Sequence, residues 1–175
     1  ATSIRLFTIE LGIGEDPLRC RLKHAVLISC EAYEAISYVW GEPVYSYSLI
    51  CNDQILMITP SLRDVLLRVR RTHVSRTIWA DGACINQEDL NERGHQVNLM
   101  SDVYRKETRV LIHLGPADEN IVSKALELIH GINNKHEMPA PSSDDWIPLL
   151  EFGSCQWFRR LWVVQECVLA QEAIV

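Results

Sequence analysis

Three short apolar runs alternate with amphipathic segments, and this alternation constrains the fold more than any other feature of the chain. The runs are YEAISYVWG (33–41), TIWADGACI (77–85) and RVLIHLG (109–115). The spacing of apolar residues predicts a helix from Ser61 after the first run, and a longer helix from about Gln87 to Tyr104 after the second. Continuous apolar runs are typical of parallel strands that are covered on both sides. The sequence therefore predicts an α/β fold with a mostly parallel sheet and helices on both faces.

The first sixty residues predict an antiparallel addition to that sheet. The segments SIRLFTIE (3–10) and LRCRLKHAVL (18–27) alternate between apolar and polar residues, as half-buried strands do. The segment YSLICNDQILMI (47–58) is typical of a hairpin with Asn52 and Asp53 at its turn. We therefore expect an N-terminal antiparallel β segment beside the parallel strands.

The remainder of the chain predicts two more helices and a final strand. ENIVSKALELIHG (119–131) is predicted to be a helix that ends at Gly131, and residues 133–148 resemble a loop. A last helix is expected over roughly 154–171, before the strand-like EAIV. We expect one domain over residues 1–175. Because the sequence stops inside an apolar run, we expect it to be the truncated N-terminal part of a longer protein.

Composition excludes several classes of function. The formal net charge of the 175 residues is -6 and no dense Lys/Arg tract occurs, so a nucleic-acid partner is disfavoured. The six cysteines form no CxxC pair and no zinc-like spacing with histidine, so no metal site is expected. The absence of a phosphate-loop glycine pattern means that no bound cofactor is expected either. Scattered cysteines and the absence of a signal peptide or a membrane-length apolar run favour a cytoplasmic protein without membrane contact.

Candidate ligand-binding residues follow from a rule for open parallel sheets, in which ligands bind beyond the carboxyl ends of the strands. Ser37, Tyr38, Trp40 and Gly41 end the first apolar run. The segment from Asp81 to Asn86 ends the second run. No P-loop, dinucleotide fingerprint or GxSxG elbow is present, which disfavours an ordinary cofactor carrier and a serine hydrolase of that type.

The polar residues at the end of the second run have two interpretations. Asn86 is suited to cap the following helix, with acidic residues in its first turn, or to hold a ligand. Asp81 lies within an apolar run, where a carboxylate must be paired or hydrogen-bonded. An ion pair with Arg93 and direct contact with a ligand both remain open. A Cys84–His95 nucleophile pair is the weaker alternative.

The predicted last helix, SCQWFRRLWVVQECVLAQ, carries a carboxylate on a mostly apolar surface. At about 100° per residue, Trp157, Leu161, Val164 and Val168 form one stripe. Glu166 points nearly opposite to that stripe. A helix that is apolar around most of its circumference is expected to be buried, so Glu166 either pairs with Arg159 or Arg160 or lines a cleft.

Taken together, these segments resemble a known family. YEAISYVWG, IWADGACINQEDLNERGHQVNLMSDVYRKETRVLIHLG and FRRLWVVQECVLA resemble, in order and spacing, the three signature blocks of the HET domain, the fungal heterokaryon-incompatibility domain. The resemblance covers nearly the whole chain, although Gly82 and Ala83 follow Asp81 where the family more often has a bulkier residue. It implies a role in the programmed cell death that follows fusion of incompatible fungal cells. It also implies self-association, and contact with other incompatibility proteins or with regulatory domains of a longer chain.

HET domains are similar to TIR domains, which implies a flavodoxin-like sheet and an enzymatic site. SCQWFRRLWVVQE resembles the TIR helix that surrounds the NAD-cleaving site, although Val163 follows Trp162 where TIR domains have Cys. The resemblance implies that Glu166 is the catalytic glutamate and that NAD is a substrate rather than a cofactor. The residues expected to bind the substrate are Ser37, Tyr38, Trp40, Gly41, Asp81, Asn86, Arg160 and Trp162. The alternative is a non-enzymatic signalling and oligomerisation module in the same death pathway.

Overall fold

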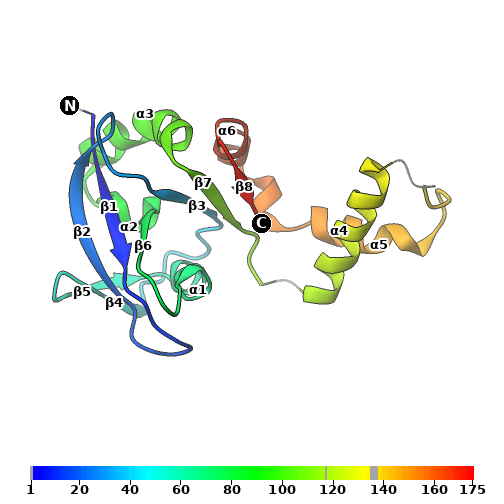
Figure 1. Ribbon diagram of the computed structural model, residues 1–175, viewed down its shortest axis with the longest axis horizontal. Helices are drawn as coiled ribbons and strands as arrows, with labels where there is room; N and C mark the ends of the chain where they lie inside the picture. The colour runs from blue at the N-terminus through cyan, green and yellow to red at the C-terminus, as the bar shows by residue number, and fades with distance from the viewer. Residues whose placement is uncertain (1, 117, 135–137) are drawn as a thin grey trace. The chain divides into compact units, whose positions relative to one another are not determined.

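The computed structural model describes residues 2–116, 118–134 and 138–175. Over these residues the chain is a mixed α/β protein with one eight-stranded sheet, in the order β5-β4-β2-β1-β6-β3-β7-β8 (Figure 1). It forms two compact units, one of Ala1–His113 with Leu161–Val175 and one of Leu114–Arg160. The strands are β1 (Ser3–Ile9), β2 (Arg19–Val26), β3 (Glu34–Tyr38), β4 (Tyr47–Cys51), β5 (Gln54–Ile58), β6 (Arg76–Trp79), β7 (Arg109–His113) and β8 (Ala173–Ile174).

Pairing in the sheet divides it into a parallel and a mixed part. Strand β3 is parallel to both β6 and β7, and β7 is parallel to β8. Strand β1 is antiparallel to β2 and to β6, while β2 is parallel to β4. Strands β4 and β5 form the predicted hairpin, and its turn residues Asn52 and Asp53 have φ values of 49° and 63°. The antiparallel addition is thus confirmed, and the sheet as a whole is mixed.

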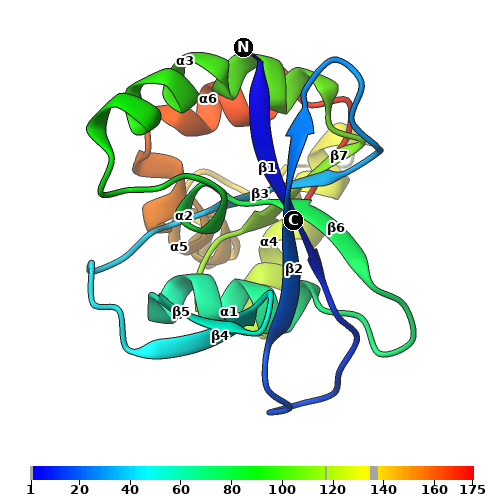
Figure 2. The same ribbon diagram turned by 90° about the vertical axis from the view of Figure 1, so that its left-hand side faces the viewer.

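The helices of the first unit are α1 (Pro60–Val69), α2 (Asp81–Cys84), α3 (Leu90–Lys106) and α6 (Trp162–Val168). Helix α1 begins where the sequence predicted, because the Thr59 hydroxyl accepts a hydrogen bond from the Leu62 N–H and Pro60 suits the first turn. It buries Leu62, Val65 and Leu66. Helix α1 contacts β3 and β4, whereas α3 contacts α6 (Figure 2).

The second apolar run is shorter as a strand than predicted, and the helix after it begins later. Strand β6 ends at Trp79, and residues 81–84 form the short helix α2 instead of continuing the strand. Helix α3 is capped by Asp89, whose carboxylate accepts from the N–H groups of Asn91 and Glu92. The prediction that Asn86 caps this helix was wrong. Its side chain instead accepts from the Glu88 N–H at 3.1 Å, a local turn contact that these residues often make.

The predicted last helix, over roughly 154–171, is broken in two, and this prediction was wrong. A 3₁₀ turn, η2 (Gln156–Arg159), ends in an extended backbone at Arg160 (φ −84°, ψ 128°), and α6 starts only at Trp162. Trp157 is therefore not part of the predicted stripe, since it is buried in η2, while Val164 and Val168 of α6 are 63% and 74% exposed rather than buried. Side chains of α6 that are buried are Val163 and Glu166.

The second unit consists of α4 (Glu119–Asn133), η1 (Asp144–Trp146), α5 (Ile147–Gly153) and η2. Helix α4 forms as predicted but continues beyond Gly131, so that glycine does not end it. The unit's aromatic cluster joins Phe158 to Phe152 and to Trp157, with ring centroids 5.3 Å and 5.0 Å apart. In the predicted loop 133–148, residues 135–137 lie outside the described residues.

Candidate functional site

The centre of the candidate site is a buried contact between the end of β3 and helix α6. The Ser37 hydroxyl donates a hydrogen bond to Oε2 of Glu166. Ser37 is the next-to-last residue of β3, and both side chains are only 1% exposed. Burying a carboxylate is costly unless hydrogen bonds or charges stabilise it. This contact therefore brings together two residues that lie 129 positions apart in the sequence and that were both predicted to belong to the site.

The loops after β3 and β6 are joined by a second contact. The indole Nε1 of Trp40 donates to Oδ2 of Asp81 at 2.9 Å, while the Gly82 N–H donates to Oδ1 of Asp81 at 2.8 Å. The Asp81 carboxylate thus has hydrogen-bond donors on both oxygens. Asp81 is half-buried at the start of α2, where the helix dipole also favours a negative charge. The hydrogen bond from Trp40 is a partner of Asp81 that the sequence analysis did not consider.

A residue missed by the sequence analysis, Gln87, completes this loop arrangement. Its side-chain Nε2 donates to the backbone carbonyl of Asp81 at 3.0 Å. The signal that could have indicated it is its spacing, because Gln87 follows Asp81 closely enough to close a compact loop over α2. The segment from Asp81 to Gln87 is therefore held by the side chains of Trp40 and Gln87, which both donate hydrogen bonds to Asp81.

Two glycines of the site are explained by close approach. A Cβ on Gly82 would overlap the hydroxyl of Tyr38, which is itself only 2% exposed. Gly41 has φ +67°, and a Cβ there would lie 2.6 Å from Oγ of Ser61. Both positions need glycine for packing, since left-handed φ values and missing side chains are what glycine provides. The bulkier residue more usual in the family after Asp81 has no room here, because Tyr38 occupies that space.

Two other predicted residues, Asn86 and Trp162, have exposed side chains. Asn86 is exposed, and its backbone N–H donates to Oε1 of Glu92 at 2.8 Å. Trp162 begins α6 and is 45% exposed, although it lies four residues before the buried Glu166. Arg160 is the last residue of the second unit. The structure therefore brings Ser37 to Glu166 and Trp40 to Asp81.

Thiol chemistry is disfavoured at this edge of the sheet. Cys84 is buried, and burial raises the pKa of its thiol to about 12. A thiol with such a pKa is almost wholly protonated at neutral pH and is a poor nucleophile. The weaker alternative of a Cys84–His95 pair is therefore not supported. Among the described residues, no group of three or more His, Cys, Asp or Glu side chains is arranged to hold a metal ion.

A further buried carboxyl group, Glu107, was missed by the sequence analysis. It follows α3 as its C-terminal cap residue and is 0% exposed. Burial raises the pKa of Glu107 to about 7, and the backbone N–H of Gln171 opposes this shift. No pattern in the sequence singled out this residue, because the last turn of an amphipathic helix is usually solvated.

No helix among the described residues is both long and apolar enough to cross a membrane.

Comparison with known proteins identifies the family. The model of the heterokaryon incompatibility protein family (HET) matches residues 33–166. The chain is 27% identical, over an alignment of 223 residues, to heterokaryon incompatibility protein 6, OR allele, of Neurospora crassa. The alignment covers 99% of this chain and 33% of that protein, so the chain spans about a third of its relative's length. No solved structure matches. The match includes β3, α2, α3 and Glu166, and the chain therefore belongs to the heterokaryon incompatibility (HET) family.

Proposed function

We propose that this chain is an effector module of fungal heterokaryon incompatibility and that it cleaves NAD at the nicotinamide–ribose bond when it self-associates. Family membership and the name of the Neurospora relative support the first part. The observation that carries the second part is the buried Glu166 carboxylate, which accepts a hydrogen bond from Ser37 at the end of a central parallel strand. A buried carboxylate is a candidate for a catalytic role because the protein must offset the cost of removing its charge from water.

A TIR-like core forms part of this proposal. Strands β6, β3, β7 and β8 pair in parallel, and β3 lies between two strands that follow it in the chain. In Figure 2, α1 lies below these strands and α3 and α6 lie above them. The chain therefore reverses its direction of growth at β3, and open α/β sheets bind ligands beside such a strand. Ser37, Tyr38 and Trp40 lie at or just beyond its carboxyl end.

The proposed reaction needs a carboxylate more than it needs a strong acid. The bond between the ribose C1′ and the nicotinamide nitrogen breaks, and both electrons move to the ring, which leaves as neutral nicotinamide. Positive charge develops at C1′ and the ring oxygen, as in glycoside cleavage. The Glu166 carboxylate stabilises this charge electrostatically. Water then attacks C1′ and loses a proton to solvent, giving ADP-ribose; attack by the adenosine group instead gives a cyclised product.

Activation by self-association is proposed because Glu166 is closed to solvent while the outer side of α6 is not. Leu161, Val164 and Val168 are 85%, 63% and 74% exposed, and their spacing places them on one side of the helix. We propose that this side, called here the α6 surface, contacts other copies of the chain, other incompatibility proteins or regulatory domains. Contact at this surface shifts α6 and exposes Glu166 to NAD.

The test measures nicotinamide release at increasing protein concentration, with the chain alone and fused to a tetramer-forming coiled coil. Release that rises faster than linearly with concentration, and that is lost in Glu166→Gln and strongly reduced in Val164→Asp, is the expected result. Circular dichroism and sedimentation verify folding and assembly of each variant. Absence of release from the fused tetramer would overturn the proposed chemistry.

One observation favours a second function, a non-enzymatic docking module. The same closed carboxylate beside an exposed apolar helix surface suits a module that only binds partners. In that case Val164→Asp abolishes assembly, whereas Glu166→Gln assembles normally and neither protein releases nicotinamide.

A further inference from the structure

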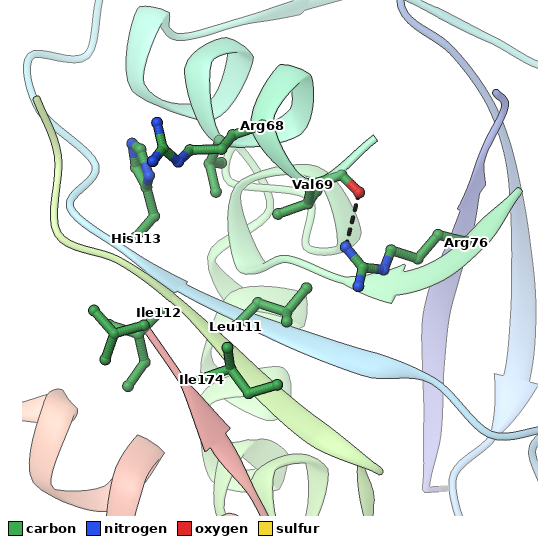
Figure 3. Close-up of a pocket in the computed structure, with 9 residues that line it drawn as sticks. Arg68, Val69, Arg76, Leu111, Ile112, His113 and Ile174 are labelled. Carbon is green, nitrogen blue, oxygen red and sulfur yellow. Dashed lines mark hydrogen bonds between the residues drawn. The ribbon is translucent and has the colours of Figure 1, made fainter. Parts of the chain in front are cut away.

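A cavity of about 280 Å³ lies beside α1 in the first unit, and the proposed chemistry does not use it. Its aliphatic lining includes Val65 and Val69 of α1, Leu111 of β7 and Ile174 of β8 (Figure 3). The volume is close to the lower end of the range of small-molecule sites, about 300–1,000 Å³. The walls are thus suited to a short apolar group.

The polar side chains that line this cavity are basic. They are Arg68, Arg76 and His113, and no Asp or Glu side chain is among the described lining residues. The basic lining of the cavity contrasts with the chain as a whole, whose formal net charge is -6. Figure 3 shows the Arg68 guanidinium beside the His113 ring, both extending from the neighbouring ends of α1 and β7.

The two arginines differ in how they are held. Arg76 forms an ion pair with Glu34, and its Nη1 donates to the Val69 carbonyl at 2.8 Å. Its charge is therefore compensated and its position fixed. Arg68, in contrast, is exposed on the last turn of α1. Arg68 is thus the cation that remains available to a ligand at the mouth of the cavity.

The surroundings of His113 disfavour the charged form of its ring. Burial lowers its pKa, and the positive charge of Arg68 lowers it further, while Asp64 opposes both effects. Asp64 lies one turn before Arg68 on α1 and is 3.7 Å from the Arg63 guanidinium. An anion bound between Arg68 and His113 would reverse this balance, because it would stabilise the charged imidazole.

The cavity is separate from the Ser37–Glu166 contact. Ser37 pairs with Ile112 across β3 and β7, whereas Tyr38 pairs with His113. Successive side chains of a strand point to opposite faces of the sheet, so Ser37 and His113 lie on opposite faces. A ligand beside His113 therefore lies on the face opposite to Ser37, although it shares a face with Tyr38, one of the residues predicted to bind NAD.

We propose that this cavity binds a small organic anion with an apolar body. The anionic group lies between Arg68 and His113, and the apolar body lies against Val65, Val69, Leu111 and Ile174. Arginine binds carboxylates and phosphates in a fixed geometry, and the aliphatic walls select against fully polar anions. The proposed ligand is a short-chain carboxylate.

The test titrates the isotopically labelled chain with hexanoate, hexylammonium and inorganic phosphate. Nuclear magnetic resonance follows the His113 ring and the methyl groups of Leu111 and Ile174. Saturable binding of hexanoate is expected, with perturbed methyl signals and a raised His113 pKa. Neither hexylammonium nor phosphate alone should reproduce it. Equal binding of hexylammonium, equal binding of phosphate, or no saturable hexanoate binding would each overturn the proposal.

Matched variants test the role of Arg68 itself. Arg68→Gln should weaken hexanoate binding about tenfold or more, because a hydrogen bond to a charged group is lost. Lys124→Gln removes the same charge from α4 in the second unit and should leave binding unchanged. Equal weakening in both variants would show a nonspecific charge effect and contradict the site.

Discussion

Two buried carboxyl groups lie near opposite ends of β3, and their surroundings differ. At the carboxyl end, Glu166 accepts a hydrogen bond from Ser37, and Trp40 and Asp81 join the adjacent loops. At the amino end, Glu107 is 0% exposed, and the neighbouring Thr108 donates to the Tyr33 carbonyl just before β3 begins. Within the described residues, neither carboxyl oxygen of Glu107 has a hydrogen-bond partner of standard geometry.

The difference in hydrogen bonding indicates different roles for Glu107 and Glu166. Burial that the Gln171 N–H compensates only in part favours the protonated form and makes Glu107 a group that links stability to pH. A hydrogen bond from a hydroxyl group instead orients Glu166 and partly compensates its desolvation. The carboxyl end of β3 is thus organised to hold a carboxylate in one position, and the amino end is not.

The largest expected effect compares the same substitution at both ends. Glu166→Gln should reduce nicotinamide release by the assembled chain about 100-fold or more, because the neutral amide no longer stabilises the charged sugar. Glu107→Gln, an equally conservative change of a buried acid, should leave release near the wild-type level at pH 7. Chromatographic measurement of nicotinamide under identical protein concentrations decides between them. An equal loss of nicotinamide release in both variants would mean that replacing either buried acid reduces activity only by disturbing the fold.

The second prediction concerns the pH dependence of stability at the amino end. The folded-state pKa of Glu107 is about 7, above its ordinary value of 4.5. Between these values the folded chain keeps a proton that the unfolded chain has lost, so the free energy of unfolding should fall as pH rises. The total change attributable to this group should be on the order of 3 kcal/mol. Urea unfolding at several pH values measures it.

Glu107→Gln is the control for that pH effect. The stability of this variant relative to wild type should increase from about pH 4.5 to 7 and then remain constant. A difference that is independent of pH would show that Glu107 ionises normally, and would remove the contrast with Glu166.

The third prediction removes one hydroxyl group at each end. Ser37→Ala should cost about 1–3 kcal/mol, because the buried Glu166 carboxylate loses its donor. Thr108→Val removes a hydrogen bond to a neutral carbonyl, 2.9 Å long, and should cost about 0.5–1.5 kcal/mol. Urea unfolding of both variants measures the two costs. A larger cost for Thr108→Val would mean that the Ser37–Glu166 contact contributes little.

The smallest expected effect concerns α3, which begins near the carboxyl edge of the parallel strands and ends beside Glu107. Asp89→Ala should destabilise the chain by about 1 kcal/mol, because two N–H groups of α3 lose their acceptor. Asn86→Ala should cost less than about 0.5 kcal/mol, since Asn86 is exposed and does not cap the helix. Thermal unfolding followed by circular dichroism compares them, and a reversed order would restore Asn86 as the cap.

Local patterns predicted many elements because each depends on neighbours in the sequence. Thr59, Pro60 and the apolar face of α1 are sufficient to start and orient that helix. The β4–β5 hairpin follows from Asn52 and Asp53, which adopt positive φ values readily. The prediction of one continuous last helix was wrong because the apolar pattern continues on both sides of Arg160. The backbone at Arg160 is extended and ends the helical segment, although no glycine or proline marks this break in the sequence.

By itself, the sequence determined the α/β class, the approximate places of the central strands and the family to which the chain belongs. Its motifs singled out Ser37 and Glu166, but their separation of 129 residues left their contact unspecified. Tertiary structure decided which acids are buried, since Glu166 and Glu107 both lie in segments that local patterns would leave solvated or paired with arginine. It also decided that Tyr38 fills the space above Gly82 and that Arg68, Arg76 and His113 lie together at the cavity beside α1. The physical reason is that hydrogen bonding and turn chemistry act between near neighbours, whereas desolvation depends on every segment that packs around a group.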